Sequence, residues 1–573
     1  MNRACVAVFT VVASTASVAF AQDRPSESEM FGGSSSESPP ADSAPKSPNE
    51  KAEPTPTAAS PAVVTPETTP TPALPPSKGA SEANANASGV DAPPKSNAES
   101  TRDTQILGTT ETPMFTEETA PEDPLKVGGQ LYLRTQSTAS AGQKFTDFSF
   151  NAPSLVDLYL DARPNDRVRG FVLGRMAYDP TLPASASSPS SSGQALAATG
   201  STAGSASLSS LFQQQTRDPK VYLDQLWLRF DIAHRLFVTA GKQHVRWGTA
   251  RFWAPTDYLH LRPRNPLDVF DARTGTTMLK LHLPIESKGW NFYAYGLTEG
   301  PDATSTLGRL GGAARAEFVI DTTEVGLGAM VQKGRKPKYA IDLSTGISDF
   351  DFYGEMALRY QDDIDRVRYD ANATSPALPA ELPTNLIPYI DTNQARNAYY
   401  AQVADAYYPT YRRQGIRPQA VGGVNYSRKY NDNDTFTLGA EYFYNPLGYN
   451  SPINYPGLVL PHSVPLRDSA NFFYLGRHYA ALYITFPAPY SLDNHTFTLS
   501  TIGNLSDKSF ITRFDYSLIA LTHIRFEAFV SGRYGNENGE FRFGIRSLQL
   551  GNLAPISRAA AFMDFGLALR VAI

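Results

Sequence analysis

Apolar and polar residues alternate along most of the chain beyond position 124, in segments of about ten residues. In residues 349–360, Phe352 and Met356 share one face with other apolar residues, whereas Asp351 and Glu355 share the opposite face. The same alternation occurs in residues 154–163, 321–332, 435–445, 510–518 and 523–534. One face suits lipid and the other suits water, and the length is that of a tilted strand that crosses a bilayer.

Short polar turns and long irregular segments separate these strands in alternation. The short turns are predicted at residues 164–167, 231–235, 284–288, 320–323, 346–349, 431–434, 487–494 and 520–522. The longer segments include residues 179–218, 361–415, 446–477 and 535–559. Long extracellular loops at one rim and short periplasmic turns at the other are typical of outer-membrane barrels. The pattern therefore predicts an all-β fold for residues 125–573, a transmembrane antiparallel β-barrel of about 18 strands (16–18), with both chain ends at the periplasmic rim.

The last segment supports this prediction. Residues 562–573 place Phe565, Leu567, Leu569 and Val571 on one face and small or charged residues on the other. The segment resembles the C-terminal strand by which outer-membrane barrels are recognised for insertion, although it ends in isoleucine where an aromatic residue is usual. A soluble sandwich or propeller is the alternative. The 29 tyrosines and 31 phenylalanines, many of them near strand ends, favour the membrane barrel with its aromatic girdles.

The chain before the barrel has a different composition. Residues 1–21 show a basic start, a short apolar run and a small-residue cleavage site, so we expect a secretory signal peptide that is cleaved after Ala21. Residues 22–124 are rich in Pro, Ser, Ala, Thr and Glu, which predicts a disordered linker in the periplasm. Cys5 is the only cysteine, so the mature chain would contain no disulfide and no thiol site.

Charge is distributed unevenly between the two parts. Residues 22–124 contain 17 acidic and 6 basic residues. Removing these and Arg3 from the totals of 56 acidic and 51 basic residues leaves 39 and 44 beyond position 124. The acidic balance therefore belongs to the linker, and the predicted barrel is mildly basic.

The stretch 237–275 has the strongest functional signal. It begins as a strand, carries Lys242, His244 and Arg246 at a spacing of two, and continues as a loop rich in Pro and Arg. A strand face with such a row is expected to line water, where charges of one sign favour the opposite ion. The candidate pore and constriction residues are Lys242, His244, Arg246, Arg251, Arg262, Arg264, Arg229, Lys280, Arg315 and Arg359.

Each of these assignments has a purely structural alternative. Each basic residue could instead pair with a carboxylate across the barrel; the acidic candidates are Asp157, Asp161, Glu317, Glu355 and Glu441. Leu236, Val238 and Ala240 share the parity of Lys242, so this strand could contain a bulge. Trp247 and Trp253 could stack against a sugar ring or could anchor the membrane interface.

A resemblance to a known family rests on the same stretch. Four short motifs follow one another: Gly241-Lys242-Gln243, Trp247-Gly248, Pro255-Thr256-Asp257 and Asn265-Pro266-Leu267-Asp268. They resemble the signature of porin-like outer-membrane proteins of the alginate-export and phosphate-selective porin kind. The resemblance implies a passive β-barrel pore in a Gram-negative-type outer membrane, whose third extracellular loop folds inward to narrow the lumen.

Three functions are compatible with these patterns. We expect an outer-membrane porin that forms a water-filled channel for transport of small hydrophilic solutes, with a mild anion preference; the alternatives are a structural or surface-interaction barrel with a plugged lumen and an outer-membrane hydrolase. Beyond residue 21 no apolar run is long enough for a spanning helix. The histidines lack metal spacing and no hydrolase or phosphate-loop motif occurs, so no metal, cofactor or enzymatic activity is predicted.

The expected partners follow from this location. They are outer-membrane lipid, small hydrophilic or anionic solutes and, through residues 22–124, peptidoglycan or a periplasmic protein. Nucleic acid is not among them. Porins of this kind occur as monomers or trimers, and the patterns do not indicate a subunit face.

Overall fold

The computed structural model describes most of the predicted barrel region. The described residues are 124–182, 218–260, 263–267, 273–298, 310–361, 364–377, 394–430, 435–464, 466, 471–551 and 556–572. The predicted signal peptide (1–21) and all of the predicted linker except Pro124 lie outside them. Arg262 and Asp268 also lie outside the described residues.

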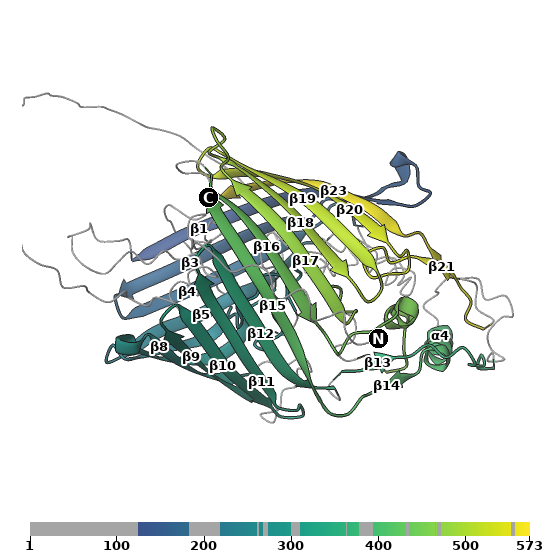
Figure 1. The fold of residues 1–573 in the computed structure, drawn as a ribbon, viewed down its shortest axis with the longest axis horizontal. Helices are drawn as coiled ribbons and strands as arrows, with labels where there is room; N and C mark the ends of the chain where they lie inside the picture. The colour runs from purple at the N-terminus through teal and green to yellow at the C-terminus, as the bar shows by residue number, and fades with distance from the viewer. Residues whose placement is uncertain are drawn as a thin grey trace, which may run out of the picture. The chain divides into compact units, whose positions relative to one another are not determined.

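Eighteen antiparallel strands form one closed sheet (Figure 1). They are β1 (Leu125–Ser140), β3 (Ser154–Asn165), β4 (Val168–Tyr178), β5 (Lys220–Ile232), β6 (Leu236–Gln243), β7 (Thr276–Ile285), β8 (Trp290–Leu297), β9 (Gly311–Ile320), β10 (Thr323–Gln332), β11 (Lys338–Ile347), β12 (Phe350–Tyr360), β15 (Ile416–Lys429), β16 (Thr435–Tyr444), β17 (His478–Pro487), β18 (His495–Asn504), β19 (Ser509–Ala520), β20 (Ile524–Gly535) and β23 (Ala561–Ala572). Each pairs with the next, and β23 pairs with both β20 and β1. The predicted barrel and its strand number are confirmed.

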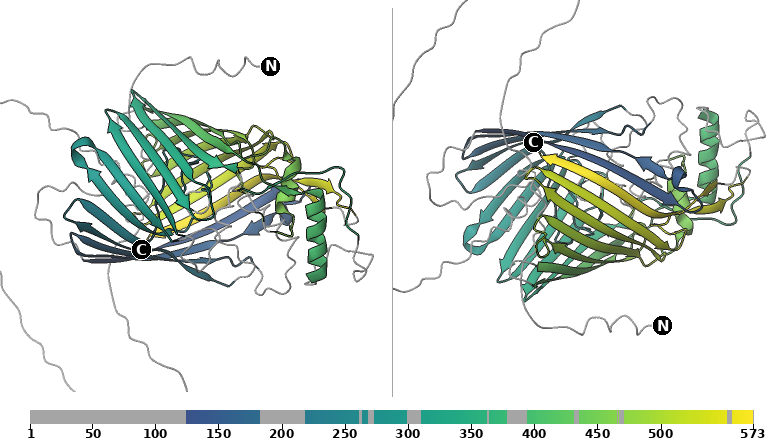
Figure 2. Two further views of the ribbon diagram at one scale, coloured as in Figure 1. Left: turned by 90° about the horizontal axis from the view of Figure 1, so that it is seen from below. Right: turned by 90° about the horizontal axis from the view of Figure 1, so that it is seen from above.

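The junction between the first and last strands closes the sheet. Gln130 of β1 lies opposite Ala572 of β23, and the pairing continues to Ala139 opposite Met563 and, after a register shift, to Ser140 opposite Ala561. Figure 2 shows β1 and the C-terminal strand side by side. Closure leaves no exposed sheet edge. An exposed edge would be unfavourable in a bilayer, because lipid cannot form hydrogen bonds with the backbone.

Short turns and both ends of the described barrel lie at one rim. Strands β3 and β4 are separated by two residues, as are β9 and β10, and the other predicted short turns also occur where expected, except 431–434, which lies outside the described residues. The N–H of Arg163 donates to the Pro124 carbonyl (2.6 Å), and the N–H of Ala572 donates to the His523 carbonyl (2.8 Å). The first and last strands therefore start and end beside the short turns.

Smaller elements belong mostly to the segments between strands. They are β2 (Ser149–Asn151), β13 (Arg366–Val367), β14 (Thr410–Tyr411), β21 (Ile545–Leu548), β22 (Ile556–Arg558), the α-helices α4 (Gln394–Tyr407) and α5 (Tyr455–Val459), and the 3-10 turns η1 (Phe145–Asp147), η2 (Glu286–Lys288) and η5 (Pro452–Asn454). In Figure 1, α4, β13, β14 and β21 lie beyond the strand ends opposite the C-terminus. None of the described helices has the length and hydrophobicity to cross a bilayer.

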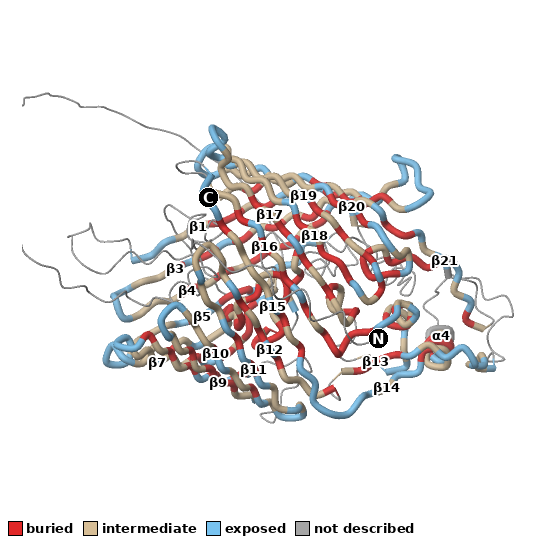
Figure 3. The backbone as a smooth tube through the Cα atoms, viewed as in Figure 1, coloured by how far each residue is buried: buried red, intermediate tan, exposed pale blue. Residues whose placement is uncertain are grey.

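The two faces of the sheet have opposite chemistry. Leucines such as Leu158 and Leu482 are exposed on the outer face (62% and 57%), whereas neighbouring charged residues such as Asp157 and Arg175 are buried on the inner face. Figure 3 shows buried and partly exposed residues alternating along the strands. An apolar exterior around a charged interior is the reverse of a soluble barrel, and it confirms the predicted transmembrane class of the fold.

Because the outer face is apolar, a charge introduced there should destabilise the barrel more in the middle of a strand than in a turn near the interface. Leu482→Arg, in the middle of β17, is expected to lower the free energy of unfolding by roughly 2–4 kcal/mol in a bilayer. The matched change Leu521→Arg, in the turn between β19 and β20, should cost at most about 1 kcal/mol because this site is near the interface. Urea titration of the full chain in lipid vesicles measures both values, and equal losses would contradict the assigned outer face.

Candidate functional site

The loop after β6 packs against the inner wall of the barrel. Its residue Trp253 is fully buried and stacks on Phe443 of β16, with ring centroids 5.5 Å apart. Trp253 also contacts Tyr479 of β17 (5.5 Å), and Phe252 contacts Tyr483 edge-on (5.8 Å). Aromatic pairs at these distances stabilise packing beyond area burial alone. The described residues between His244 and Gly275, called the inward loop below, thus pack against the inner wall.

Glu441 of β16 binds three consecutive amides of the inward loop. Its carboxylate accepts hydrogen bonds from the N–H groups of Arg251 (2.9 Å), Phe252 (3.2 Å) and Trp253 (2.9 Å). The hydroxyl of Tyr353 donates to the same carboxylate at 3.0 Å. Successive amides that converge on one anion form a concave anion site, so the wall supplies the charge and the loop supplies the donors.

Glu355 of β12 holds the adjacent part of the inward loop. It accepts hydrogen bonds from the Ala250 N–H (2.6 Å) and the Thr256 hydroxyl (2.7 Å). Gly248 has a φ of +96°, and a Cβ added there would clash with Glu355 Oε1. The glycine of the Trp247-Gly248 motif is therefore required both by the backbone conformation and by the close approach of this carboxylate.

Asp224 of β5 joins the two ends of the inward loop. Its carboxylate lies 3.2 Å from His244 Nε2 and accepts the Gly275 N–H at 3.2 Å. Arg175 lies 3.4 Å away on β4. His244 was predicted to line water, but its imidazole is buried and is engaged by this carboxylate.

A second buried carboxylate, Asp257, organises the middle of the inward loop. It contacts His260 Nδ1 (3.1 Å) and accepts a hydrogen bond from Arg273 (2.9 Å). His260 Nε2 lies 3.4 Å from His244 Nδ1, which links both acidic centres. Burial alone would raise the pKa of Asp257, but the positive charges of His260 and Arg273 lower it below its ordinary value.

Lys242 does not share a face with the residues that follow it. It lies opposite Leu226, which is exposed on the outer face, whereas its neighbour Gln243 is buried and donates to the Met278 carbonyl (3.3 Å). Strand β6 ends at Gln243, so the spacing of two that connects Lys242 to His244 and Arg246 crosses the end of the strand. The expectation of one lumenal row is therefore corrected for Lys242, which follows the parity of Val238 and Ala240.

Three predicted basic residues lie over aromatic rings at the inward loop and the wall. The Arg251 guanidinium lies 3.7 Å from the Tyr483 ring centroid. Arg359 lies 5.3 Å from the centroid of Tyr258, a loop residue. Lys280 lies 5.4 Å from the Tyr293 ring of the neighbouring strand. Such cation–π contacts hold the charged groups in place.

The other predicted basic residues have varied surroundings. Arg315 is buried and forms two hydrogen bonds to Asp342 (2.7 and 2.8 Å) and one to Glu317 (2.7 Å), so the ion-pair alternative holds for it. Arg246 donates to the Ala250 carbonyl within the inward loop. The remaining two are Arg229, whose guanidinium lies 5.2 Å from the Phe237 ring centroid, and Arg264, whose carbonyl accepts the Tyr474 hydroxyl (3.4 Å).

Both tryptophans proposed as solute contacts are buried between the loop and the wall. Trp247 contacts Tyr258 (6.2 Å) and Tyr295 (5.7 Å), and the Arg315 guanidinium lies 5.7 Å from its ring. The rings of neither Trp247 nor Trp253 are open to a solute or to the lipid interface in this conformation. Their observed role is to pack the inward loop.

The sequence patterns missed Asp224 and His260 as parts of the site. Asp224 lies where the β4–β5 register shifts, between Gln225 and Leu223, and a bulge of this kind is invisible to a period-two pattern. His260 has no strand around it whose parity could be read. Among the described residues, no group of three or more His, Cys, Asp or Glu side chains is placed to hold a metal ion.

Comparisons with known proteins find similarity only among solved structures. No protein-family model and no curated protein matches the chain. OccK11 (OpdR) of Pseudomonas aeruginosa is 8% identical, with 78% of this chain and 95% of that chain covered and a TM-score of 0.40. OccAB1 of Acinetobacter baumannii is 10% identical, with 78% and 96% covered and a TM-score of 0.40. A Rhodopseudomonas blastica porin is 9% identical, with 78% and 99% covered and a TM-score of 0.34.

The chain is a closed 18-stranded β-barrel. The closed barrel that the resemblance implies is confirmed as a fold. The narrower resemblance to alginate-export and phosphate-selective porins stays a prediction.

Proposed function

We propose that this protein is an outer-membrane porin, a passive channel for small hydrophilic solutes with a mild anion preference. The observation that carries the proposal is the combination of an apolar outer face with a charged interior, into which one long loop folds and is held by wall carboxylates. In this proposal the short-turn rim faces the periplasm, so the segment 22–124 would lie there and contact peptidoglycan or a periplasmic protein. Assembly as a monomer or a trimer stays open.

The anion preference is supported by how the charges around the inward loop are used. Glu355 and Glu441 accept several hydrogen bonds from the loop, which disperses their negative charge. Arg251 and Arg359 lie over tyrosine rings, which hold these positive groups in place, and we propose that the region of the inward loop thereby carries a surplus of positive charge. In a water-filled lumen with a low-dielectric wall, such a surplus raises the local anion concentration.

Arg251 provides the direct test of selectivity. Its backbone N–H anchors the loop, so Arg251→Glu changes the charge while keeping that donor. We expect the chloride-to-potassium permeability ratio to fall by roughly twofold to tenfold. Single-channel recording of the reconstituted full chain under a KCl gradient measures it through the reversal potential. The charge-conserving Arg251→Lys should keep the wild-type ratio; a cation-selective wild type would contradict the anion preference but not the channel.

A plugged structural barrel is the second candidate. It is favoured by the two clusters of buried side chains that join the inward loop to the wall, one around Trp253 and the other around Trp247. The same conductance experiment separates the porin from the plugged structural barrel. A folded barrel that passes no current would favour the structural function. The hydrolase alternative has no observation in its favour among the described residues, and we propose no enzymatic activity.

A further inference from the structure

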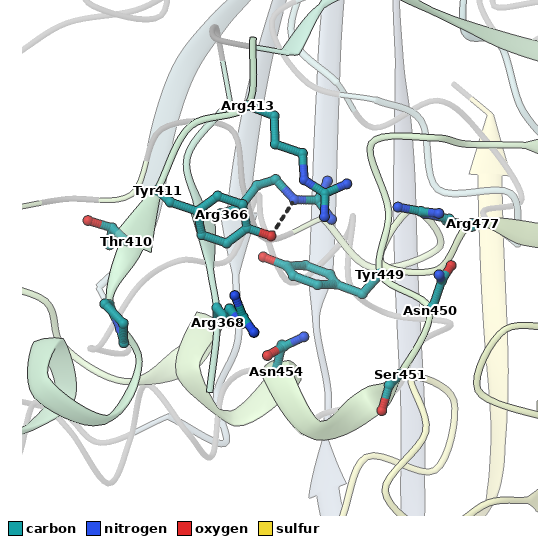
Figure 4. A pocket seen from close by; sticks show the side chains of 11 residues that line it. Arg366, Arg368, Thr410, Tyr411, Arg413, Tyr449, Asn450, Ser451, Asn454 and Arg477 are labelled. Atoms are coloured by element: carbon teal, nitrogen blue, oxygen red, sulfur yellow. Dashed lines mark hydrogen bonds between the residues drawn. The ribbon is translucent and has the colours of Figure 1, made fainter. Parts of the chain in front are cut away.

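A pocket separate from the inward loop lies among the long loops. Its cavity measures about 640 Å³ and is formed by the β13–β14 hairpin and by the segment between β16 and β17 (Figure 4). Its lining includes Arg366, Arg368, Arg413 and Arg477, together with Tyr411 and Tyr449. This volume is in the range of sites for small molecules.

Among the residues that the structure describes, four arginines and no acidic residue line this pocket. Arg366 is 3% exposed and donates to the carbonyls of Leu447 and Gly448, the latter at 2.8 Å, and to the Tyr411 hydroxyl at 3.4 Å. Arg477 donates to the same Gly448 carbonyl at 3.3 Å. Two of the four guanidinium groups are thus oriented by backbone carbonyls, which fix their position but do not neutralise their charge.

The other two guanidinium groups have no acidic partner in the described part of the chain. Neither Arg368 nor Arg413 forms an ion pair there, although Arg412, on the same hairpin, pairs with Asp365. Burial together with the positive charges of Arg413 and Arg366 lowers the pKa of Arg477. Figure 4 shows Arg366, Arg413 and Arg477 directed toward the space beside Tyr449. This cationic crowding is unfavourable unless an anion enters.

Neutral groups complete the pocket. The Tyr449 ring lies 4.5 Å from the Arg366 guanidinium, and its hydroxyl is fixed by the Val367 N–H at 3.0 Å. The Asn454 side chain accepts the Tyr369 N–H through Oδ1 at 2.8 Å, which points to its amide N–H₂ as a further donor. A ligand would therefore meet charged donors on one part and aromatic surface on another.

We propose that this pocket binds a phosphate monoester, with the phosphate among the four arginines and the organic part against Tyr411 and Tyr449. A phosphate monoester carries close to two negative charges and three acceptor oxygens, which suits several guanidinium forks better than a single-charged carboxylate does. The phosphate could belong to a small soluble ester or to a phosphorylated glycolipid headgroup of the outer leaflet. The site lies outside the inward loop, so it does not depend on whether the barrel conducts.

Titration calorimetry on the full chain in detergent tests this site with phenyl phosphate as the probe. We expect the double variant Arg368→Gln/Arg413→Gln to weaken binding at least tenfold, because both groups line the cavity without an acidic partner among the described residues. Arg412→Gln is the matched control on the same hairpin and should change affinity less than twofold, since its charge faces Asp365. Retained heat-modifiable migration on gels shows that each variant is folded.

Three further measurements decide the chemistry and the source of the phosphate. Benzoate should bind at least tenfold more weakly than phenyl phosphate; equal binding would overturn the phosphate assignment. Binding of the detergent-solubilised chain to vesicles with a phosphorylated glycolipid, and not to vesicles with its dephosphorylated form, would identify the headgroup source, whereas binding of phenyl phosphate without vesicle binding would identify a soluble ester. Failure of both probes, or the same affinity in the double variant, would overturn the site.

Discussion

Replacing Glu441 with alanine is expected to release the inward loop and to raise the single-channel conductance severalfold. The wild-type carboxylate accepts three backbone N–H groups and the Tyr353 hydroxyl, and alanine leaves these buried donors without that acceptor. Loss of a charged acceptor at a buried site costs about 2–5 kcal/mol, which is enough to populate conformations in which the loop has left the wall. Planar-bilayer recording of the reconstituted full chain measures the conductance and its fluctuations.

Two related variants sharpen this experiment. Glu441→Gln keeps one acceptor oxygen in the same volume and should give an intermediate conductance, whereas Glu355→Ala, which frees Ala250 and Thr256, should act in the same direction as Glu441→Ala. The expected increase holds for both an open and a plugged wild-type barrel, because the loop occupies the lumen in each. Unchanged conductance in a correctly folded Glu441→Ala barrel would show that the observed contacts do not hold the loop.

Raising the pH from about 4.5 to about 8 is expected to loosen the loops that meet at Glu540. Burial and the negative charge of Asp507 raise the pKa of Glu540 from 4.5 to about 8, against the hydrogen bonds from Tyr479 and Asn504. Between these two values the folded state binds the proton more tightly than the unfolded chain, so stability falls as the pH rises. The contribution of the Glu540 proton to the stability of the folded state is complete below about pH 4.5 and is lost above about pH 8.

Hydrogen exchange of the full chain at several pH values measures this effect. The Leu475 N–H donates to Glu540 (3.4 Å) and the Glu540 N–H donates to Asp507 (2.8 Å), so protection of both amides should decline above neutral pH, after correction for the intrinsic exchange rate. Glu540→Gln removes the titration and should make the corrected protection nearly independent of pH in this range. A variant with the wild-type pH slope would assign the effect to another group.

The barrel itself could be predicted because its physical cause is local. A strand between lipid and a polar interior must alternate in polarity, so residues such as Phe352 and Glu355 reveal their faces by parity alone. Turns are similarly local, since a two-residue connection between β9 and β10 needs only a polar interruption of the pattern. The same reasoning failed for the row of Lys242, His244 and Arg246, because β6 ends at Gln243 and parity has no meaning beyond the strand end.

The internal contacts of the site could be predicted much less well. The basic character of the inward loop is visible in the sequence, but the acceptors that hold it are distant in the chain. Glu355 lies about one hundred positions from the loop residues it binds, and Glu441 lies almost two hundred positions from its own. The arginine pocket has the same origin: Arg366 meets the Leu447 carbonyl, 81 positions away in the chain. Such pairings depend on which strands the closed sheet places near each other.

By itself, the sequence determined the class of this protein: alternating polarity, strand length and the order of turns and loops specify a membrane barrel of about 18 strands, because each is imposed by the bilayer on a short stretch of chain. Only the tertiary structure decided what fills and surrounds the pore. Closure of the sheet brings Glu355, Glu441 and Asp224 to the inward loop and gathers four arginines from two loops into one pocket, through contacts between residues that have no shared periodicity.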